Sequence, residues 1–522
     1  MVLVKDHKIS FGENMVARQP AGIRMTNKPV LTRRQMMAMT ATALCAPYVT
    51  TRGARQEGGA RLEGIEPKGS LVQESTMEGH RLADNVVPAH PNGWQLSRNR
   101  WMIFYSTRSF RGIDDDWSMV YQLRKDAPDG PVIREGFFKR TQMGWDPIGD
   151  GTTPCAMQHS HPVVFGVPRG AVLEGKPAPN ANVFAASWRR KAVHWIAATN
   201  QIEHPTLPSD PPSEYVSRHP ALNTPSHQFL CVEWVQFRLN AREDDIEIIA
   251  PVTILRQQGF ETGERYCNAS VRSMNAGFVT PVPFNRECTE WIGVNHFDGG
   301  RVAFCKYTFD AKRGRYVWSH MGPLLGSSDL PLMEGFVARF HDDWIIGARR
   351  QGGSGAVWGR TADPFGHAPA LKLIQTPGTT TPRTAYMCPD GVLRIFTGDL
   401  GVSYYGNARD PLYSWDVDPD NQFAVSNRRV VIDLRKFGLP MRPEIQPWAD
   451  NCKLLPPQGR HQILVYRVHA SANDRARPTV AAFWKNNPKI IPSINGQEKA
   501  ACGCYYSVIT YSEEVPPMWR FA

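Results

Sequence analysis

Hydrophobic and polar residues alternate along most of this chain in short runs that are separated by turn-forming residues. One theme recurs: a strand-like run, a tight turn rich in Asp, Pro and Gly, and a second strand-like run. Clear examples are WSMVYQLRKDAPDGPVI (117–133), VEWVQFRLNAREDDIEII (232–249) and RVAFCKYTFDAKRGRYVWS (301–319). This pattern is typical of antiparallel hairpins, and segments with helical periodicity are almost missing.

Many similar hairpins in one chain favour a β-propeller in which each unit supplies strands of one blade. The predicted propeller spans residues 76–522. A jelly roll or a β-sandwich is the structural alternative. Residues 51–75 are polar and Gly-rich, and they are predicted to be a linker.

The composition changes this picture little but excludes several classes of protein. The chain of 522 residues has 60 Lys+Arg and 49 Asp+Glu, and residues 1–34 alone hold seven of the basic and two of the acidic residues. The remaining positive charge is too dilute for nucleic-acid binding. No P-loop, GxGxxG, HExxH or GxSxG motif occurs in the structural setting that it requires, so nucleotide binding, zincin-type proteolysis and serine-hydrolase activity are not indicated. The cysteines after Cys45 lack regular spacing and are interpreted mostly as buried thiols, so we expect neither a metal site nor a cofactor.

The first 50 residues form a separate segment. Arg33 and Arg34 precede a short, weakly apolar run from Met36 to Ala46, and small residues that suit cleavage follow. This order predicts a twin-arginine export signal over residues 1–50 and a periplasmic or extracellular location for the folded chain. No apolar stretch reaches about 18 residues, so no transmembrane segment is expected in the mature chain.

A run of three aspartates marks the first candidate site. Residues 108–130 read RSFRGIDDDWSMVYQLRKDAPDG, and Asp114, Asp115 and Asp116 come just before a predicted strand. Such a run is often only a solvated loop tip. With the preceding strand WMIFYSTR and the following DAPDG turn, however, the stretch resembles the sialidase superfamily, in which a catalytic aspartate precedes a strand ending in arginine. The resemblance implies that Asp114 is the acid/base, with Asp115 and Asp116 as close competitors.

A second stretch, MEGFVARFHDDWIIGARRQGGSGAVWGRTADP, is similar to the same family. Sialidases carry a glutamate, then a strand, a polar turn, a second strand and an arginine. Here Glu334 precedes Arg349 and Arg350 by 15 and 16 residues. In the family the glutamate is the base that activates a tyrosine nucleophile, and the arginine binds the substrate carboxylate. The next unit offers Arg409 as a later arginine of the same clamp.

These residue types suit the cleavage of a glycosidic bond. One group must protonate the leaving oxygen, and another must trap or stabilise the cation-like centre. Planar arginines hold a substrate carboxylate by two-point contact. Clustered aspartates raise one another's pKa, which suits a proton donor.

The chain departs from the family pattern at several points. Val86 stands where the family has its first arginine, so Arg81, Arg108 and Arg111 are the candidates to replace it. No Asp-box hairpin is intact. The strand that begins PWADNCKLL should carry the family's tyrosine but has none. The candidates for that role elsewhere in the chain are Tyr404, Tyr405, Tyr413 and Tyr466.

The resemblance implies an exported, divergent bacterial member of the family, with a six-bladed propeller of antiparallel four-stranded blades. It further implies a glycoside hydrolase that acts on glycans, in particular on terminal acidic sugars such as sialic acid. The expected partner is therefore a glycan or polysaccharide substrate. A non-catalytic glycan-binding propeller and a polysaccharide lyase stay open as alternatives.

Overall fold

The computed structural model separates the chain into two compact units, Met1–Ala54 and Arg55–Ala522. The structure describes residues 59–72, 86–109, 116–139, 142–144, 155–194, 228–255, 261–262, 273–275, 279–297, 299–350, 355–374, 384–399, 401–402, 409–437, 445–472 and 502–521. The predicted export signal, residues 1–50, lies outside this part of the chain, as do Arg111, Asp114 and Asp115.

All regular structure in the described residues is β-strand, and the sheets are named here in chain order. Sheet 1 contains β2 (Val86–Ser97), β3 (Arg100–Ser109), β4 (Asp116–Lys125) and β5 (Val132–Lys139). Sheet 2 contains β6 (Gln142–Gly144), β7 (Cys155–Val167), β10 (Val183–His194), β11 (Gln228–Leu239), β12 (Ile246–Leu255) and β13 (Glu261–Thr262). Sheet 3 contains β14 (Ser273–Asn275), β15 (Val282–Pro283), β16 (Glu290–Phe297), β17 (Arg301–Asp310) and β18 (Arg315–Met321).

The second half of the chain continues in the same way. Sheet 4 contains β19 (Leu332–Phe340), β20 (Asp343–Arg350), β21 (Ala356–Thr361) and β22 (Lys372–Ile374). Sheet 5 contains β23 (Thr384–Met387), β24 (Leu393–Thr397), β25 (Leu412–Asp418) and β26 (Ala424–Ile432). Sheet 6 contains β27 (Ile445–Leu454), β28 (His461–Ala472), β29 (Gly503–Tyr511) and β1 (Leu62–Val72). A small sheet is formed by β8 (Ala171–Leu173), β9 (Lys176–Pro177) and β30 (Arg520–Phe521).

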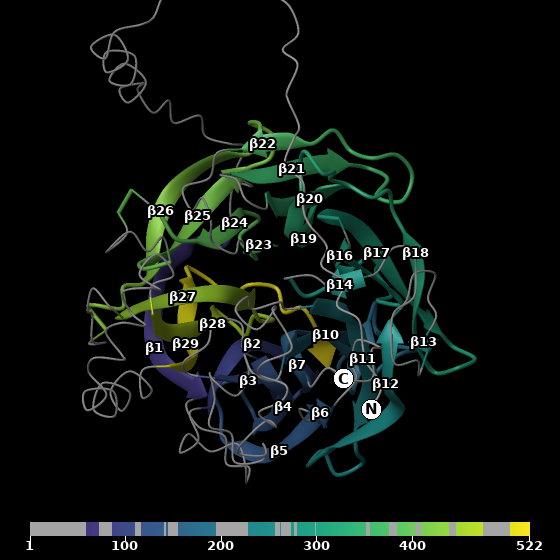
Figure 1. Ribbon diagram of the computed structural model, residues 1–522. Coiled ribbons are helices and arrows are strands. Elements are labelled where there is room, and N and C mark those ends of the chain that lie inside the picture. The colour runs from purple at the N-terminus through teal and green to yellow at the C-terminus, as the bar shows by residue number, and fades with distance from the viewer. Residues whose placement is uncertain are drawn as a thin grey trace, which may run out of the picture. The chain divides into compact units, whose positions relative to one another are not determined.

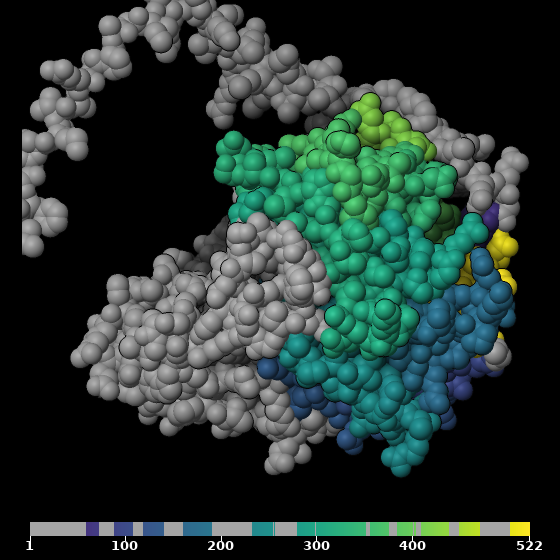
Figure 2. Space-filling model, turned by 90° about the vertical axis from the view of Figure 1, so that its right-hand side faces the viewer, coloured from purple at the N-terminus to yellow at the C-terminus, as the bar shows by residue number. Residues whose placement is uncertain are grey.

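Sheets 1 to 6 follow one another around a ring, as in a β-propeller (Figure 1). Each sheet contacts the next in chain order, through β2 and β7, β10 and β14, β16 and β19, β19 and β23, and β23 and β27. Sheet 6 then contacts sheet 1 through β27, β28 and β2, so the ring is closed. In Figure 2, blue, teal and green residues from successive sheets form one continuous surface along the side of the ring.

The prediction of an all-β fold with antiparallel sheets is confirmed, and a ring of separate sheets differs from a jelly roll or a sandwich. Two expectations need correction. Sheets 2 and 3 have six and five strands instead of four. Strand β1, at Leu62–Val72, lies in the range predicted as a linker but pairs antiparallel with β29. A polar, Gly-containing strand suits this edge position, because only part of its surface is covered. No helix of the described residues is long and apolar enough to cross a membrane.

Apolar side chains fill the interfaces between the sheets. Residues Trp101 to Tyr105 in β3 are all fully buried, although successive side chains of a strand point to opposite faces. Such a strand needs cover on both faces, and the neighbouring sheets of the ring supply it. The outer strand β5 has less cover, and Val132 and Ile133, whose side chains point to opposite faces, are both exposed.

Candidate functional site

Four strands next to the centre of the ring carry a backbone irregularity at a buried polar residue. His90 in β2, His161 in β7, Glu334 in β19 and Asn451 in β27 all have left-handed φ angles between 50° and 57°. The pairing register of each strand shifts at or beside this residue. All four residues are buried. A bulge re-aims a side chain, and the left-handed form costs a non-glycine residue about 1–3 kcal/mol, so the surrounding contacts must hold it in place.

Glu334 and Arg349, both singled out from the sequence, contact each other. Strands β19 and β20 pair with Met333 opposite Arg349. Arg349 Nη1 donates to Glu334 Oε1 at 3.0 Å and to Oε2 at 3.1 Å. Exposure is only 9% for the Glu334 side chain and 19% for Arg349, so each charge depends on the other. Arg350, the next residue of β20, is half-buried, and its side chain points to the face of the sheet opposite to that of Arg349.

Arg409 binds a carboxylate that the sequence pattern did not single out. Its Nη1 donates to Asp450 Oδ2 at 2.9 Å, and its guanidinium carbon lies 5.0 Å from the centre of the Trp448 ring. Arg467 holds Asp450 from another side, where Nε and Nη2 donate to Oδ1 and Oδ2 at 2.7 and 2.8 Å. The side chains of Asp450 and Arg467 are each 2% exposed, whereas Arg409 is 23% exposed. One buried carboxylate thus orients a partly exposed arginine.

His90 extends this network from sheet 6 to sheets 1 and 2. Arg467 Nη1 donates to His90 Nε2 at 2.9 Å. The ring of His161 lies 4.2 Å from that of His90, centroid to centroid. Ser160 Oγ accepts a hydrogen bond from Arg189 Nε at 3.0 Å and lies 3.0 Å from His161 Nδ1. Charged and polar groups from β2, β7, β10, β27 and β28 therefore form one continuous central network.

Lys453 relates this network to Glu334. Lys453 follows the bulge of β27 and is 3% exposed. Burial lowers the pKa of its ammonium group to about 7, and the nearby Cys452 and Glu334 oppose this effect. Because the Glu334 carboxylate acts on Lys453, the central strands β19 and β27 share one electrostatic environment.

The acidic run and its neighbouring arginines stay predictions. Arg108 at the end of β3 is the register partner of Asp116 at the start of β4. The side chains of these two residues lie outside the described part of the chain, together with Arg111, Asp114 and Asp115.

Tyr466 does not suit the role of a nucleophile. It is fully buried, and its hydroxyl lies 2.9 Å from Ser507 Oγ. Burial raises its pKa far above the ordinary value for tyrosine, which opposes formation of a phenolate. The missing tyrosine in PWADNCKLL therefore has no replacement in Tyr466.

Sequence reasoning missed His90, Asp450, Arg467 and Lys453. The sequence does contain an indication of buried charges, because the segments PWADNCKLL and LVYRVHA place charged residues inside otherwise apolar strands. Buried charges are rare unless they are paired, so such interruptions indicate a network. Among the described residues, no group of three or more His, Cys, Asp or Glu is arranged to hold a metal ion.

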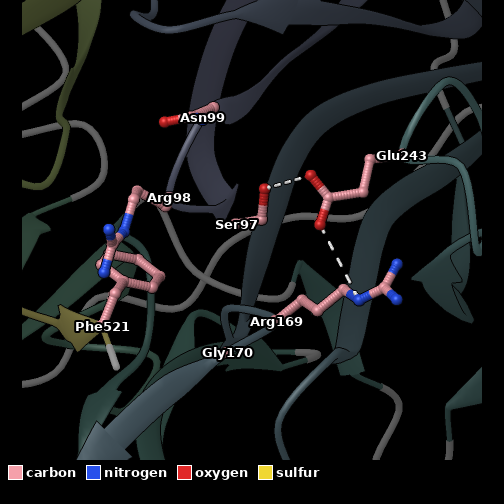
Figure 3. A pocket seen from close by; sticks show the side chains of 7 residues that line it. All are labelled: Ser97, Arg98, Asn99, Arg169, Gly170, Glu243 and Phe521. Carbon is pink, nitrogen blue, oxygen red and sulfur yellow. Dashed lines mark hydrogen bonds and ion pairs between the residues drawn. The ribbon is translucent and has the colours of Figure 1, made fainter.

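A hollow of about 330 Å³ lies at the other end of sheet 1, beside the β2–β3 turn (Figure 3). It is lined by Ser97, Arg98, Asn99, Arg169, Gly170, Glu243 and Phe521. Ser97 Oγ donates to Glu243 Oε2 at 2.9 Å, and Arg169 Nε lies 3.7 Å from Glu243 Oε1. These contacts join sheet 1 to the β11–β12 turn of sheet 2, so we interpret them as a connection between neighbouring sheets.

Comparison with known proteins gives only distant likenesses. No family model and no curated protein matches the chain. Similar solved structures include a protein of unknown function from Dyadobacter fermentans, with 9% identity and a TM-score of 0.49, covering 88% of this chain and 100% of that one. The NanB sialidase from Streptococcus pneumoniae has 8% identity and a TM-score of 0.41, with 86% and 70% covered. An α-L-arabinofuranosidase from Fusarium graminearum has 11% identity and a TM-score of 0.41, with 85% and 98% covered. At this distance the likenesses assign neither substrate nor residue roles.

Proposed function

We propose that the chain is a β-propeller glycoside hydrolase whose active site is the central network. The Glu334–Arg349 contact is the observation that supports this most directly. Both residues were selected from a sialidase-like pattern, and they meet as a buried pair on strands beside the centre of the ring, with Glu334 at a strained bulge. Strained, buried charges at the centre of a fold are more often found at functional sites than elsewhere.

In this proposal Glu334 is the base or nucleophile activator, and Arg349 fixes the orientation of its carboxylate. Asp114 or Asp115 supplies the proton to the leaving oxygen. Arg349 and Arg409 bind an acidic group of the substrate, since planar guanidinium groups match carboxylates. Arg350, whose side chain points to the opposite face of β20, is the less suitable of the two candidates from this strand.

Arg108 and Arg111 are further candidates for substrate binding in the proposal. Because Tyr466 is committed to the core, a carboxylate serves directly in place of the family's tyrosine. This arrangement suits an acidic sugar other than sialic acid, because a carboxylate nucleophile would be repelled by the carboxylate that a sialoside carries beside the reacting centre.

Sheets 1 to 6 would be the six blades, with the small sheet of β8, β9 and β30 as an addition. Residues 1–50 would direct export of the folded chain by the twin-arginine route. The substrate would be a terminal acidic sugar on a glycan.

Hydrolysis of fluorogenic glycosides by the full chain tests this function. The panel holds a sialoside, a glucuronide and an arabinofuranoside, and the variant is Glu334→Gln. We expect turnover of one acidic glycoside that falls at least about 100-fold in the variant, because the amide cannot act as a base. Because the variant also loses the charge of a buried pair, turnover is compared per folded molecule, at a temperature at which both proteins are folded.

The matched control is Glu290→Gln. Glu290 also pairs with a cation at 3.0 Å, Lys306, but at the outer start of β16. This control should keep full turnover. Equal losses in both variants, or no turnover of any glycoside by the well-folded parent, would count against a hydrolase and favour a glycan-binding propeller. A product with new ultraviolet absorbance would instead favour a lyase.

A further inference from the structure

The hollow beside the β2–β3 turn contains a charged pair that is not joined by a hydrogen bond. Glu243 Oε2 accepts a hydrogen bond from Ser97 Oγ at 2.9 Å, but Oε1 lies 3.7 Å from Arg169 Nε, which is beyond hydrogen-bond distance. The side chains of Glu243 and Arg169 are 28% and 39% exposed. An acceptor and a donor therefore lie side by side at the wall of the hollow, as the close-up shows (Figure 3).

Both members of this pair are fixed from behind. Arg169 Nη1 donates to the carbonyl oxygens of Asn240 and Ala241 at 2.9 and 3.2 Å. Glu243 has a left-handed φ angle of 56°, and Arg100 Nε donates to its carbonyl oxygen at 2.6 Å. Groups that are already held in place lose little freedom when a ligand binds. The contacts that connect sheets 1 and 2 thus also hold Glu243 Oε1 and Arg169 Nε in a fixed geometry.

The charges of the lining favour an uncharged ligand that carries hydroxyl groups. An anion at Arg169 Nε would be repelled by Glu243, and a cation would face Arg98 and Arg169. An apolar molecule would remove water from these charges without replacing its hydrogen bonds. A hydroxyl group both donates and accepts. The 3.7 Å between Glu243 Oε1 and Arg169 Nε allows one hydroxyl oxygen to lie within hydrogen-bond distance of both atoms.

The other side of the hollow suits the apolar face of a sugar ring. Phe521 lies there, opposite Glu243 and Arg169 in the close-up (Figure 3). The guanidinium carbon of Arg98 lies 5.9 Å from the centre of the Phe521 ring, so further N–H donors are present beside it. The volume of about 330 Å³ is at the small end of the range for ligand pockets, about 300–1,000 Å³, and therefore suits one small ring.

We propose that this hollow is a second ligand site, which binds one uncharged sugar ring through Glu243, Arg169 and Phe521. Hydroxyl groups of the sugar bind between the carboxylate and the guanidinium, and its C–H groups contact the aromatic ring. The site does not rest on the proposed function, because no step of the proposed hydrolysis uses these residues. It lies at the β2–β3 turn, whereas the candidate catalytic residues belong to the central network.

Titration of the full chain with methyl hexosides, followed by saturation-transfer NMR, tests the site. The probes are the methyl glycosides of glucose, galactose and mannose, together with glycerol and inorganic phosphate. We expect saturable binding of at least one hexoside. Glu243→Gln should weaken it at least about tenfold, because a hydrogen bond to a charged acceptor is lost while the amide oxygen can still accept from Ser97. The matched control is Glu247→Gln on β12 of the same hairpin, where Glu247 pairs with Arg238 at 2.8 Å, and binding should not change.

Two further variants keep the test decisive. Asn99 is exposed at the turn, and among the described residues its side chain makes no hydrogen bond, so Asn99→Trp should fill the hollow and abolish binding in a folded chain. Glu334→Gln should bind the hexoside as the parent does, which separates this site from the central network.

Several results would overturn the proposal. They are no hexoside binding by the folded parent, glycerol binding as tight as that of the hexoside, and hexoside binding that Glu334→Gln abolishes but Glu243→Gln and Asn99→Trp leave unchanged. Phosphate binding without hexoside binding would identify an anion site instead. None of these results bears on turnover, so the proposed hydrolysis stands or fails by its own assay.

Discussion

Two buried networks of arginine and aspartate lie in this propeller, and they are built in different ways. In sheet 5, Arg394 donates to both oxygens of Asp390 at 2.6 Å and to Asp416 at 2.9 Å, and Arg429 binds Asp416 as well. All these residues come from one stretch of the chain, 390–429. The central network instead joins residues from His90 to Arg467 and draws on several sheets.

A buried ion pair is by itself no sign of function. In the sheet 5 network Arg394 is 2% exposed, and the outer member, Arg429, is 30% exposed. Burial raises the pKa of Asp416, but Arg429, Arg394 and Asn427 outweigh burial, so the pKa is lowered. This network connects neighbouring strands of one sheet. The central network instead joins strands of several sheets, and its partly exposed member, Arg409, lies over the Trp448 ring.

Breaking the sheet 5 network should have the largest effect on stability. Arg394→Met leaves Asp390 without its two-point partner, and the loss of one member of a buried pair costs about 3–5 kcal/mol. Urea unfolding measures the loss, and turnover per folded molecule should stay unchanged. The control is Arg428→Met, because Arg428 is 43% exposed in its pair with Asp399 and should cost less than about 1 kcal/mol. Equal losses in the two variants would mean that sheet 5 does not depend on its buried pair.

Removing the buried charge at the centre should instead stabilise the fold. The pKa of Lys453 is about 7 when folded, against an ordinary value of 10.5, so folding disfavours the charged form. This penalty is complete below pH 7 and disappears as the pH rises from 7 to 10.5. Lys453→Met should therefore raise the free energy of unfolding at pH 6 by up to about 4 kcal/mol.

Unfolding curves at pH 6, 8 and 10 measure how the gain from Lys453→Met declines with pH. Lys306→Met is the control, since Lys306 is paired with Glu290 and 13% exposed, and its effect should not decline in this way. A gain from Lys453→Met that is the same at all three pH values would contradict the assigned charge penalty.

The smallest effect is expected at Asp410, the neighbour of Arg409 in the chain. Burial raises the pKa of Asp410 to about 7, and Asp433 adds to this, while the hydrogen bond from the Leu434 N–H opposes it. Asp410 is fully buried, and its Oδ2 has no hydrogen-bond partner. The folded chain thus holds a proton that the unfolded chain releases between about pH 4 and 7, so stability falls as the pH rises through this range.

Asp410→Asn should remove this dependence of stability on pH and stabilise the chain at pH 8. The expected gain is only about 1–2 kcal/mol, because the new NH₂ group also needs a hydrogen-bond partner. Thermal unfolding between pH 5 and 8 measures it. The control is Asp433→Asn. The Asp433 carboxylate lies near Arg435 and Lys436, so its removal should lower the stability of the chain at pH 8. An unchanged slope in Asp410→Asn would place the titrating group elsewhere.

The parts of the site that were predicted are those that lie close together in the chain. Glu334 and Arg349 belong to one hairpin, and the pairing of β19 with β20 brings them together. The same reasoning did not find His90, Asp450 or Arg467. They meet because β2 packs beside β27 and β28, and no local pattern shows which strands are neighbours around the ring.

The strands and their hairpins could be predicted from the sequence, because alternation of apolar residues and turn chemistry are properties of neighbouring residues. The closure of the ring could not, because it depends on contacts between residues far apart in the chain. Leu62, near the start of the folded unit, pairs with Tyr511, near its end. This pairing places in a strand a segment whose sequence is typical of a linker. The tertiary structure also determines which charges lie together at the centre. His90, Asp450 and Arg467 depend on one another because strands that are distant in the chain exclude water from all three.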